Sequence, residues 1–433
     1  MKFFSTKNRK LRVTFREALN QGLSSDLGLF MPVSIPVMGT DFFSSLPRAS
    51  LPEIAFEVGS KYIGGEIPAP ELKKICIEAF DFPVEIKQLD ERRYVLELFH
   101  GPTAAFKDFG ARFMSQCFKY FSETDDRKTV VLVATSGDTG GAIANSFLGV
   151  EGVDVIILYP SQKVSLLQEN QLTTMGKNIT ALEVEGTFDD CQSMVKSAFT
   201  KLEPDKKIRL TSANSINIAR LIPQSFYYYY AVGHTGKGKK ALSVPSGNFG
   251  NLTGAVMAWK SGLPVERFIA STNINKVVPD YLMTGSYNPA ASVRTIANAM
   301  DVGNPGNFER LLGIFDNDWK KITAMVSGYW FDDHDIRQQI GYEYKKSGYI
   351  LDPHGAVASL GLDRYLKENP DSSGIFIETA HPAKFCDIVE TVIHRPLEMP
   401  ESLKGYLSGE KKTHLIKPGY SFLEEYLKGR YNL

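Results

Sequence analysis

The sequence lacks the paired cysteines and histidines of a metal site or a disulfide framework. Its four cysteines (Cys76, Cys117, Cys191 and Cys386) lie far apart, and its seven histidines include no H-x-x-x-H pair. We therefore expect four free thiols in a reducing compartment and no metal-dependent chemistry.

Charge of one sign and long apolar runs are also missing. Lys plus Arg and Asp plus Glu number 49 each, so the formal net charge is zero. Without a basic run or an acidic tail, neither nucleic acid nor an anionic membrane is expected as the main partner. No segment approaches the roughly 20 apolar residues that span a bilayer, and Met1–Lys7 has no signal-peptide core. We expect a soluble, intracellular protein located in the cytoplasm.

The 433 residues exceed the usual size of one domain, so two or three domains are expected. The continuous apolar run Thr129–Thr135 predicts a strand buried on both faces, and Lys240–Pro245 predicts a further strand. Helical patterns alternate with these runs, which favours parallel sheets covered by helices. Within the mixed α/β segment 1–90, the turn-rich stretch Gly22–Pro32 predicts a loop and a short strand without a catalytic role.

The stretch that most suggests chemistry is Phe99–Arg112, where Lys107 lies between Phe106 and Asp108. A lysine confined by apolar neighbours loses hydration, which lowers its pKa and favours the neutral amine that attacks aldehydes. Lys107 is therefore a candidate Schiff-base lysine, and pyridoxal phosphate is the usual aldehyde cofactor. On these residues alone, an ordinary surface lysine beside an aspartate is the alternative.

Three loops follow predicted strands, where parallel sheets bind ligands. Ser246–Asn251 matches neither the P-loop nor the Rossmann pattern, so it fits a small phosphate monoester or forms a plain turn. Ser136–Gly141 places hydroxyls at a helix start, which suits a carboxylate such as that of an amino acid or a simple N-cap. Thr379–Phe385 offers a hydroxyl at the end of a strand.

Together these motifs resemble the threonine synthases of the long bacterial and fungal form, within fold type II of the pyridoxal-phosphate enzymes. The resemblance covers nearly the whole chain and rests on these motifs, in order: His100–Thr103, Phe106–Asp108, Ala134–Gly140, Ala213–Asn217, Pro245–Asn251, Asn298–Val302, Asp352–His354 and Thr379–Phe385. The lysine and phosphate motifs are shared with relatives such as cysteine synthase and threonine dehydratase. One departure is Leu27, where many relatives carry glycine.

The resemblance implies an α/β fold similar to that of the tryptophan synthase β subunit, with two parallel-sheet, three-layer domains. We expect an N-terminal α/β subdomain in residues 1–90, a large cofactor-binding domain in 91–114 and 231–433, and a small inserted domain in 115–230. The active site would lie in the cleft between the two larger domains. Relatives occur as monomers and dimers, so a monomer or a homodimer is expected.

The implied function is that of a pyridoxal-phosphate-dependent carbon–oxygen lyase acting on a phosphate ester. It would convert O-phospho-L-homoserine and water to L-threonine and phosphate, the last step of threonine biosynthesis. The departing phosphate would activate the water, because no histidine or glutamate in the motifs is an obvious base.

The resemblance also implies roles for individual residues. Lys107 would attach the cofactor and move protons. The residues that would hold the cofactor are Gly247, Asn248, Phe249, Gly250 and Asn251 at its phosphate and Thr379 at its pyridine nitrogen. A neutral hydroxyl cannot keep that nitrogen protonated as an aspartate would, so the ring would be a moderated electron sink.

The residues that would bind the substrate are Thr135, Ser136, Asp138 and Thr139 at its carboxylate, and Asn214, Ser215 and Arg220 at its phosphate. Asp138 needs a compensating cation or a positioning role, because it would lie near another carboxylate. Arg220 suits phosphate through its planar guanidinium, with a solvated helix arginine as the alternative.

Two other functions stay open. A dehydratase or β-replacing enzyme would act on an unphosphorylated amino acid, and the Arg220 phosphate site argues against it. An inactive homologue would bind the cofactor or an amino acid as a sensor, and the presence of Lys107 and of the glycine loop argues against that.

Overall fold

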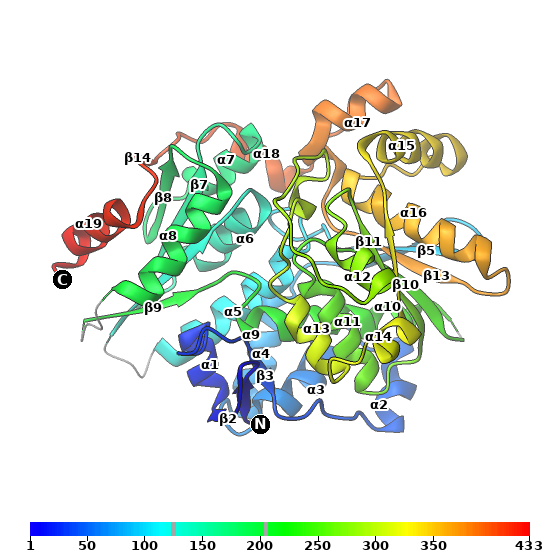
Figure 1. The fold of residues 1–433 in the computed structure, drawn as a ribbon, viewed down its shortest axis with the longest axis horizontal. Coiled ribbons are helices and arrows are strands. Elements are labelled where there is room, and N and C mark those ends of the chain that lie inside the picture. Colours follow the sequence, from blue (N-terminus) through cyan, green and yellow to red (C-terminus); the bar gives the residue numbers. More distant parts are fainter. Residues whose placement is uncertain (123–126, 203–206, 237) are drawn as a thin grey trace.

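Three β-sheets organise the chain (Figure 1), which we describe from a computed structural model covering residues 1–122, 127–202, 207–236 and 238–433. One sheet has three strands, one has six and one has five, within the described residues. The five-stranded sheet lies on the left of Figure 1 and the six-stranded sheet on the right. The predicted α/β class is therefore confirmed.

The N-terminal segment forms a small antiparallel sheet with helices beside it. Its strands, in the order β2-β1-β3, are β1 (Phe3–Ser5), β2 (Asn8–Val13) and β3 (Phe30–Pro32). Its helices are α1 (Phe15–Gln21), α2 (Thr40–Ser45), η1 (Leu46–Arg48), α3 (Leu51–Ile63) and α4 (Ala69–Ala79). The predicted loop and short strand at residues 22–32 are confirmed by β3. Helix α3 begins at a capping box formed by Ser50 and Glu53, which satisfies otherwise unpaired N–H groups.

The six-stranded sheet has the order β12-β11-β10-β13-β5-β4 and is parallel except for β4 at its edge. Its strands are β4 (Glu85–Gln88), β5 (Arg93–Glu97), β10 (Lys240–Pro245), β11 (Val265–Thr272), β12 (Val326–Trp330) and β13 (Gly374–Glu378). The helices of this region are α11 (Gly250–Lys260), α12 (Val277–Thr284), η3 (Asn298–Met300), α13 (Phe308–Ile314), α14 (Trp319–Met325), α15 (Asp333–Ser347), α16 (Pro353–Glu368), η4 (Pro382–Phe385) and α17 (Cys386–Ile393). Helix α16 packs on the three central strands and α15 packs on α16.

The five-stranded sheet is parallel throughout and has the order β14-β8-β7-β6-β9. Its strands are β6 (Lys128–Ala134), β7 (Val153–Pro160), β8 (Ile179–Val184), β9 (Ile208–Ser212) and β14 (His414–Ile416). The helices around it are α5 (Lys107–Ser122), α6 (Asp138–Phe147), α7 (Leu166–Thr173), α8 (Phe188–Lys201), α18 (Glu401–Leu407) and α19 (Tyr420–Tyr431). The segment that leads from β9 to the six-stranded sheet forms α9 (Ile218–Leu221), η2 (Ile222–Ser225) and α10 (Phe226–His234).

The chain crosses between the sheets at places that differ from the expected boundaries. Strand β4 lies before residue 91 but pairs with β5 in the six-stranded sheet. Strand β14 lies in the segment 231–433, which we expected in the large domain, yet it pairs with β8. Helix α19 packs on α8 beside it. Because β14 has only three residues and none of them is buried, it leaves no buried-strand pattern in the sequence.

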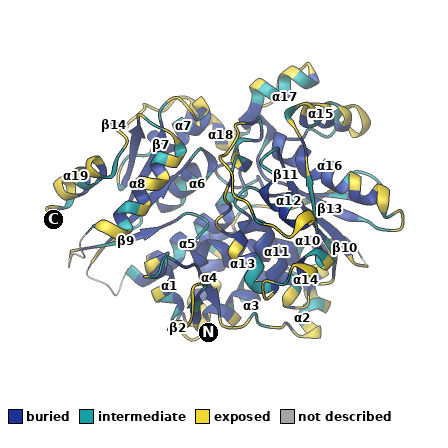
Figure 2. Cartoon of the chain, in the orientation of Figure 1, coloured by how far each residue is buried: buried dark blue, intermediate teal, exposed yellow. Residues whose placement is uncertain are grey.

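The central strands are buried on both faces, as their continuous apolar runs predict. Every residue of β7, β8, β10 and β13 is buried, and the central strands are dark in Figure 2. Three of the four consecutive tyrosines on α10, Tyr227–Tyr229, are also fully enclosed, so they are packing residues. The two sheets therefore form rigid supports for the loops at their carboxyl ends.

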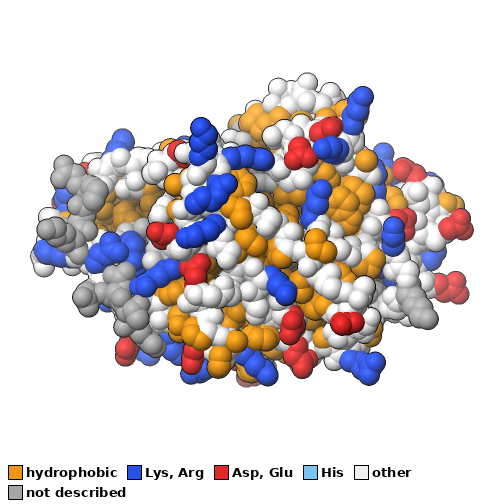
Figure 3. All heavy atoms as spheres, turned by 90° about the horizontal axis from the view of Figure 1, so that it is seen from below, with side chains coloured by type: hydrophobic (Ala, Val, Ile, Leu, Met, Phe, Trp, Pro, Cys, Tyr) orange, Lys and Arg blue, Asp and Glu red, His pale blue; other side chains and the backbone are white. Residues whose placement is uncertain are grey.

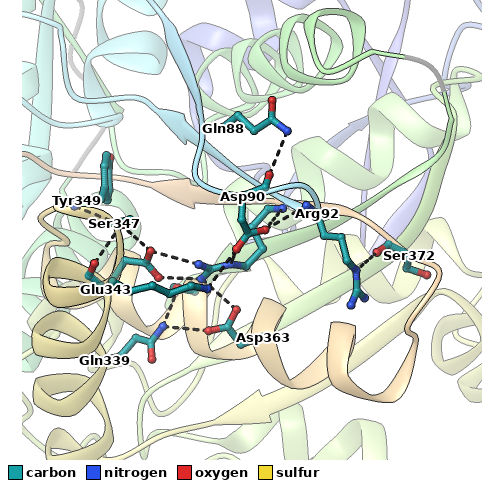
Figure 4. Close-up of polar contacts among 12 residues, drawn as sticks. Gln88, Asp90, Arg92, Gln339, Glu343, Ser347, Tyr349, Asp363 and Ser372 are labelled. Carbon is teal, nitrogen blue, oxygen red and sulfur yellow. Dashed lines mark hydrogen bonds and ion pairs between the residues drawn. The ribbon is translucent and has the colours of Figure 1, made fainter.

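The buried Arg93 connects β5 to the helices that cover it, and Figure 4 shows its partners Asp90, Glu343 and Asp363. The Arg93 guanidinium lies 2.7 Å from a Glu343 carboxylate oxygen on α15 and 3.2 Å from Asp363 on α16. Asp90 accepts a further 2.7 Å bond from the Nε of Arg93. A buried pair of this kind contributes little net energy when intact but is costly to break.

The surface carries charges of both signs. The face in Figure 3 shows lysine and arginine side chains beside aspartates and glutamates. In the part of the chain that the structure describes, no helix combines the length and the apolar character needed to cross a membrane.

Candidate active site

A cavity of about 570 Å³ lies where the carboxyl ends of both large sheets meet. It is lined by loops that follow β6, β9, β10 and β13 and by the start of α5. The structure brings together these predicted site residues around it: Lys107, Thr135, Ser136, Asp138, Thr139, Asn214, Ser215, Gly247, Asn248, Phe249, Gly250, Asn251 and Thr379. Among the predicted residues only Arg220 is not part of the lining.

Lys107 is the first residue of α5 and faces this cavity. The backbone before it is held to the end of β13, because the Phe106 N–H donates to the Thr379 carbonyl at 2.8 Å. The amine lies 4.3 Å from the centre of the Phe106 ring. Burial lowers the pKa of Lys107 to about 8, with a further lowering by Arg220 and an opposing effect of Asp138. A substantial share of neutral amine is therefore present near neutral pH.

The loop between β10 and α11 has the shape of a phosphate-binding turn. A Cβ on Gly247 would lie 2.5 Å from the Ala299 carbonyl oxygen, so no larger residue fits there. Phe249 adopts the left-handed conformation with φ of 61°, and it directly precedes α11. No side chain caps α11, and the first N–H groups of a helix have no partner within it. These N–H groups and the helix dipole favour an anion at this point.

The residues around the cavity fit pyridoxal phosphate. The uncapped start of α11 offers donors for a phosphate, Lys107 offers an amine of lowered pKa for an aldehyde, and Thr379 offers a neutral hydroxyl. The cavity is also large enough for a small heterocyclic cofactor together with an amino acid.

The loop after β6 begins a helix at the opposite side of the cavity. The Thr135 hydroxyl is used within the loop, where it accepts from the N–H groups of Gly137 and Gly140 at 3.0 Å each. Gly137 has φ of 151°, and a Cβ there would come within 2.5 Å of the Gln168 side chain. The Ser136 and Thr139 side chains are half-buried and line the cavity. The start of α6 thus presents hydroxyls and N–H groups that suit a carboxylate.

Asp138 in this loop already has a cation, which the sequence analysis did not identify. The Lys384 amine lies 2.7 Å from Asp138 Oδ1, and both side chains are buried. Burial would raise the pKa of Asp138, but Lys384 and a hydrogen bond from Gln168 hold it below its usual value. Lys384 lies in the predicted motif at residues 379–385, yet nothing in that motif indicates its partner.

Asn214 and Ser215 form a third wall of the cavity. The Asn214 amide donates to the Ala134 carbonyl at 2.8 Å, and the Asn248 amide donates to the Ser215 hydroxyl at 2.7 Å. These bonds connect the loop after β9 to the end of β6 and to the loop after β10. The wall is supported from behind by Arg310, which donates to the carbonyl of Ile216 at 2.7 Å.

Arg220 lies behind this wall and is buried. It donates to the Ala213 carbonyl, its Nε has no hydrogen-bond partner, and it forms no ion pair with any described residue. Burial lowers its pKa to about 10, so the guanidinium stays charged at neutral pH. The charge of the buried Asp108 offsets part of this lowering. A buried cation with no ion-pair partner in contact is costly and would be stabilised by a further anion. The assignment of Arg220 to the substrate phosphate stays a prediction.

The lining also includes residues that were not predicted as site residues, among them Leu23, Gln168 and His354. His354 Nδ1 lies 2.6 Å from an Asp352 carboxylate oxygen, and its Nε2 accepts from the Ala299 N–H at 3.2 Å. His354 belongs to a motif of the resemblance, which could have drawn attention to it. Leu23 comes from the N-terminal loop to which we assigned no catalytic role, and no signal in that loop points to the cavity.

Comparisons with known proteins agree with this geometry. Residues 82–377 match the family described as "Pyridoxal-phosphate dependent enzyme". Residues 2–80 match "Threonine synthase N terminus" and residues 355–426 match "Threonine synthase, C-terminal". The chain is 43% identical to the threonine synthase of Haemophilus influenzae, over 93% of this chain and 94% of that one.

Two solved structures are similar along their whole length. The crystal structure of threonine synthase from Escherichia coli has a TM-score of 0.94 and 38% identity, covering 99% of this chain and 100% of that one. The structure of pyridoxal-phosphate-bound threonine synthase from Brucella melitensis has a TM-score of 0.92 and 31% identity, covering 100% of each.

The fold and the cavity together define a pyridoxal-phosphate-dependent enzyme of fold type II. The predicted cofactor class and fold are thereby confirmed. Within that class, the chain belongs to the threonine synthase family.

Proposed function

We propose that this enzyme forms L-threonine and phosphate from O-phospho-L-homoserine and water in the cavity around Lys107. The observation that carries the proposal is the position of Lys107. Its amine has a pKa near 8 and faces the same cavity as the phosphate-binding turn before α11 and the Thr379 hydroxyl. These are the three groups that hold pyridoxal phosphate at its aldehyde, phosphate and ring nitrogen.

The cofactor, when bound, supplies an electron sink that acidifies the hydrogens on the substrate carbons next to it. Lys107 holds the cofactor through its amine and, when released by the substrate, removes the Cα proton. The same amine would then remove a Cβ proton as phosphate leaves from Cγ, and it would return one proton to Cγ and, after water has added at Cβ, one to Cα. The neutral Thr379 hydroxyl would hydrogen-bond the ring nitrogen without keeping it protonated, so the cofactor ring would withdraw electrons less strongly than a protonated ring.

The substrate carboxylate binds at the start of α6, to Ser136, Thr139 and the N–H groups of the loop. Thr135 fixes the shape of this loop through its own hydroxyl. Asn214 and Ser215 orient the substrate phosphate from the opposite wall. Arg220 neutralises that phosphate after its side chain has moved toward the cavity. Its buried guanidinium, whose Nε has no hydrogen-bond partner, supports this role. The departing phosphate then takes a proton from the water that adds at Cβ.

The remaining predictions concern the whole molecule. The large domain comprises the six-stranded sheet and the small domain the five-stranded sheet, with the N-terminal subdomain beside them. The enzyme is a monomer or a homodimer, located in the cytoplasm and free of nucleic acid. Sedimentation of the purified enzyme distinguishes the two oligomeric states.

A paired assay tests the proposal. O-phospho-L-homoserine is added to the enzyme, and phosphate and threonine are quantified in the same sample. We expect equal yields of both, abolished in Lys107→Ala. Arg220→Ala is expected to lose threonine formation far more than the absorbance change that accompanies substrate binding. Equal loss of both signals would contradict the role of Arg220, and phosphate without threonine would contradict the water-addition step.

A further inference from the structure

Lys384 lies beside the active-site cavity without lining it, and the proposed chemistry gives it no role. It lies in η4, just after β13, and its side chain is fully buried. Its partner Asp138 is the first residue of α6, which follows β6 of the five-stranded sheet, whereas β13 belongs to the six-stranded sheet. The pair therefore joins the two halves of the enzyme at the edge of the cavity.

The hydrogen-bonding capacity of Lys384 is completely used. An ammonium group has three donors. In Lys384 they meet Asp138 Oδ1 at 2.7 Å, the Thr103 carbonyl at 2.9 Å and Gln171 Oε1 at 3.1 Å. Lys384 therefore has no donor left for a substrate.

Asp138 would be an obstacle to substrate binding if it were alone. It lines the cavity beside Ser136 and Thr139, at the helix start that suits a carboxylate. Two carboxylates at close range repel each other by an energy that grows as water is excluded. Gln168 donates to Asp138 at 3.1 Å but is neutral, so Lys384 alone can cancel the charge among the described residues in contact with it.

We propose that Lys384 is a positioning residue that neutralises Asp138, so that the start of α6 accepts the substrate carboxylate. The inference rests on the proposed location of that carboxylate. Lys384 acts through Asp138 and contacts neither substrate nor cofactor. Loss of the amine leaves an uncompensated anion beside the substrate carboxylate, and loss of both charges removes the obstacle again.

The test compares two ligands that differ only in the carboxylate. L-threonine carries it, whereas L-threoninol has a hydroxymethyl group in its place. Binding to the cofactor-loaded enzymes is followed by the change in cofactor absorbance. Lys384→Met is expected to weaken L-threonine about 10- to 100-fold, the size of one unpaired charge at partly buried range, and to leave L-threoninol unchanged.

A second substitution supplies the rescue. Asp138→Asn combined with Lys384→Met is expected to restore L-threonine binding, because the carboxylate that repels the ligand is removed together with its partner. In turnover, Lys384→Met is expected to raise KM with a much smaller change in kcat. A residue that only holds the fold together would lower the melting temperature and weaken both ligands equally, with no rescue, and that result would overturn the proposal.

Asp138→Asn alone keeps the proposal falsifiable if Lys384→Met does not fold. With Asp138 neutral and Lys384 still positively charged, L-threonine is expected to bind at least as tightly as to the unchanged enzyme. Weaker L-threonine binding with unchanged L-threoninol binding would refute the inference.

Two controls separate the possible failures. Lys411→Met removes a lysine that pairs with Glu169 and Glu183 at 2.7 and 2.8 Å, outside the cavity, and is expected to leave both ligands unchanged. Ser136→Ala tests the carboxylate site itself. If Ser136→Ala weakens L-threonine but Lys384→Met does not, only the inference is wrong. If neither does, the carboxylate lies elsewhere and the proposed function fails with it.

Discussion

The lowered pKa of Lys107 makes a quantitative prediction about how fast the enzyme takes up its cofactor. With a pKa of about 8, roughly one fifth of the amine is neutral at pH 7.4. An ordinary lysine with a pKa near 10.4 has about one neutral amine in a thousand at that pH. Lys107 should therefore capture an aldehyde about 200 times faster than an unperturbed lysine of equal nucleophilicity.

The assay mixes cofactor-free enzyme with pyridoxal phosphate and follows the absorbance of the covalent linkage between pH 6 and pH 10.5. The rate is expected to rise with pH, with a midpoint near pH 8, and to level off above about pH 9. Nα-acetyl-lysine, which has a free side-chain amine, is measured under the same conditions and corrects for the titration of the cofactor itself. A rate that keeps rising in parallel with Nα-acetyl-lysine up to pH 10 would refute the reasoning.

A substitution tests the cause of the shift. Arg220 lowers the pKa of Lys107 through its charge, after the larger effect of burial. Arg220→Met keeps much of the side-chain volume and removes the charge, so the midpoint of the profile is expected to move to higher pH. An unchanged midpoint would mean that burial alone accounts for the shift.

Three other predictions concern stability. Burial and the neighbouring Asp352 raise the pKa of Glu378 well above its usual value. The folded protein therefore keeps the Glu378 carboxyl protonated where the unfolded chain has lost the proton, and the stability of the fold decreases as the pH rises from about 4. Glu378→Gln should therefore melt at a higher temperature than the unchanged enzyme at pH 8, with the difference vanishing near pH 4; the reverse trend would refute this. Arg93→Met should lower the free energy of unfolding by about 3–5 kcal/mol, because it leaves Glu343 buried and unpaired, and a loss below 1 kcal/mol in urea titrations would contradict it. Leu27 has φ of 60°, a conformation that asparagine tolerates better, so Leu27→Asn should stabilise the protein by about 1 kcal/mol, measured in the same titrations; a destabilised variant would show that the lost apolar side chain outweighs the strain.

The structure explains why Leu27 is unusual, which the sequence alone did not. Leu27 stands where many relatives of the resembled family carry glycine, and the sequence offered no reason for the difference. The positive φ supplies one, because glycine adopts it without a steric penalty. A backbone dihedral leaves no periodic pattern in a sequence, so this conformation could not be predicted.

Much of the fold and of the cavity could be predicted because their signals are local. Buried parallel strands are continuous apolar runs in the sequence, and the glycine-rich loops that follow β6 and β10 come directly after such runs. The pairs between distant segments could not be predicted. Asp138 meets Lys384 and Arg93 meets Glu343 only after the chain has folded, and either partner alone reads as an ordinary charged residue.

The pairing of β14 with β8 has a consequence for biosynthesis. Residues Leu423 and Leu427 of α19, near β14, are fully buried in the apolar cluster of the five-stranded sheet. Because ribosomes synthesise proteins from the N-terminus, β8 emerges long before the segment that covers its edge. In the interval, β8 is an unpaired edge strand next to an uncovered apolar surface, the arrangement from which aggregation starts. Nascent chains of this enzyme should therefore depend on chaperones until the entire six-stranded sheet has been translated, and messages truncated before β14 should yield insoluble protein.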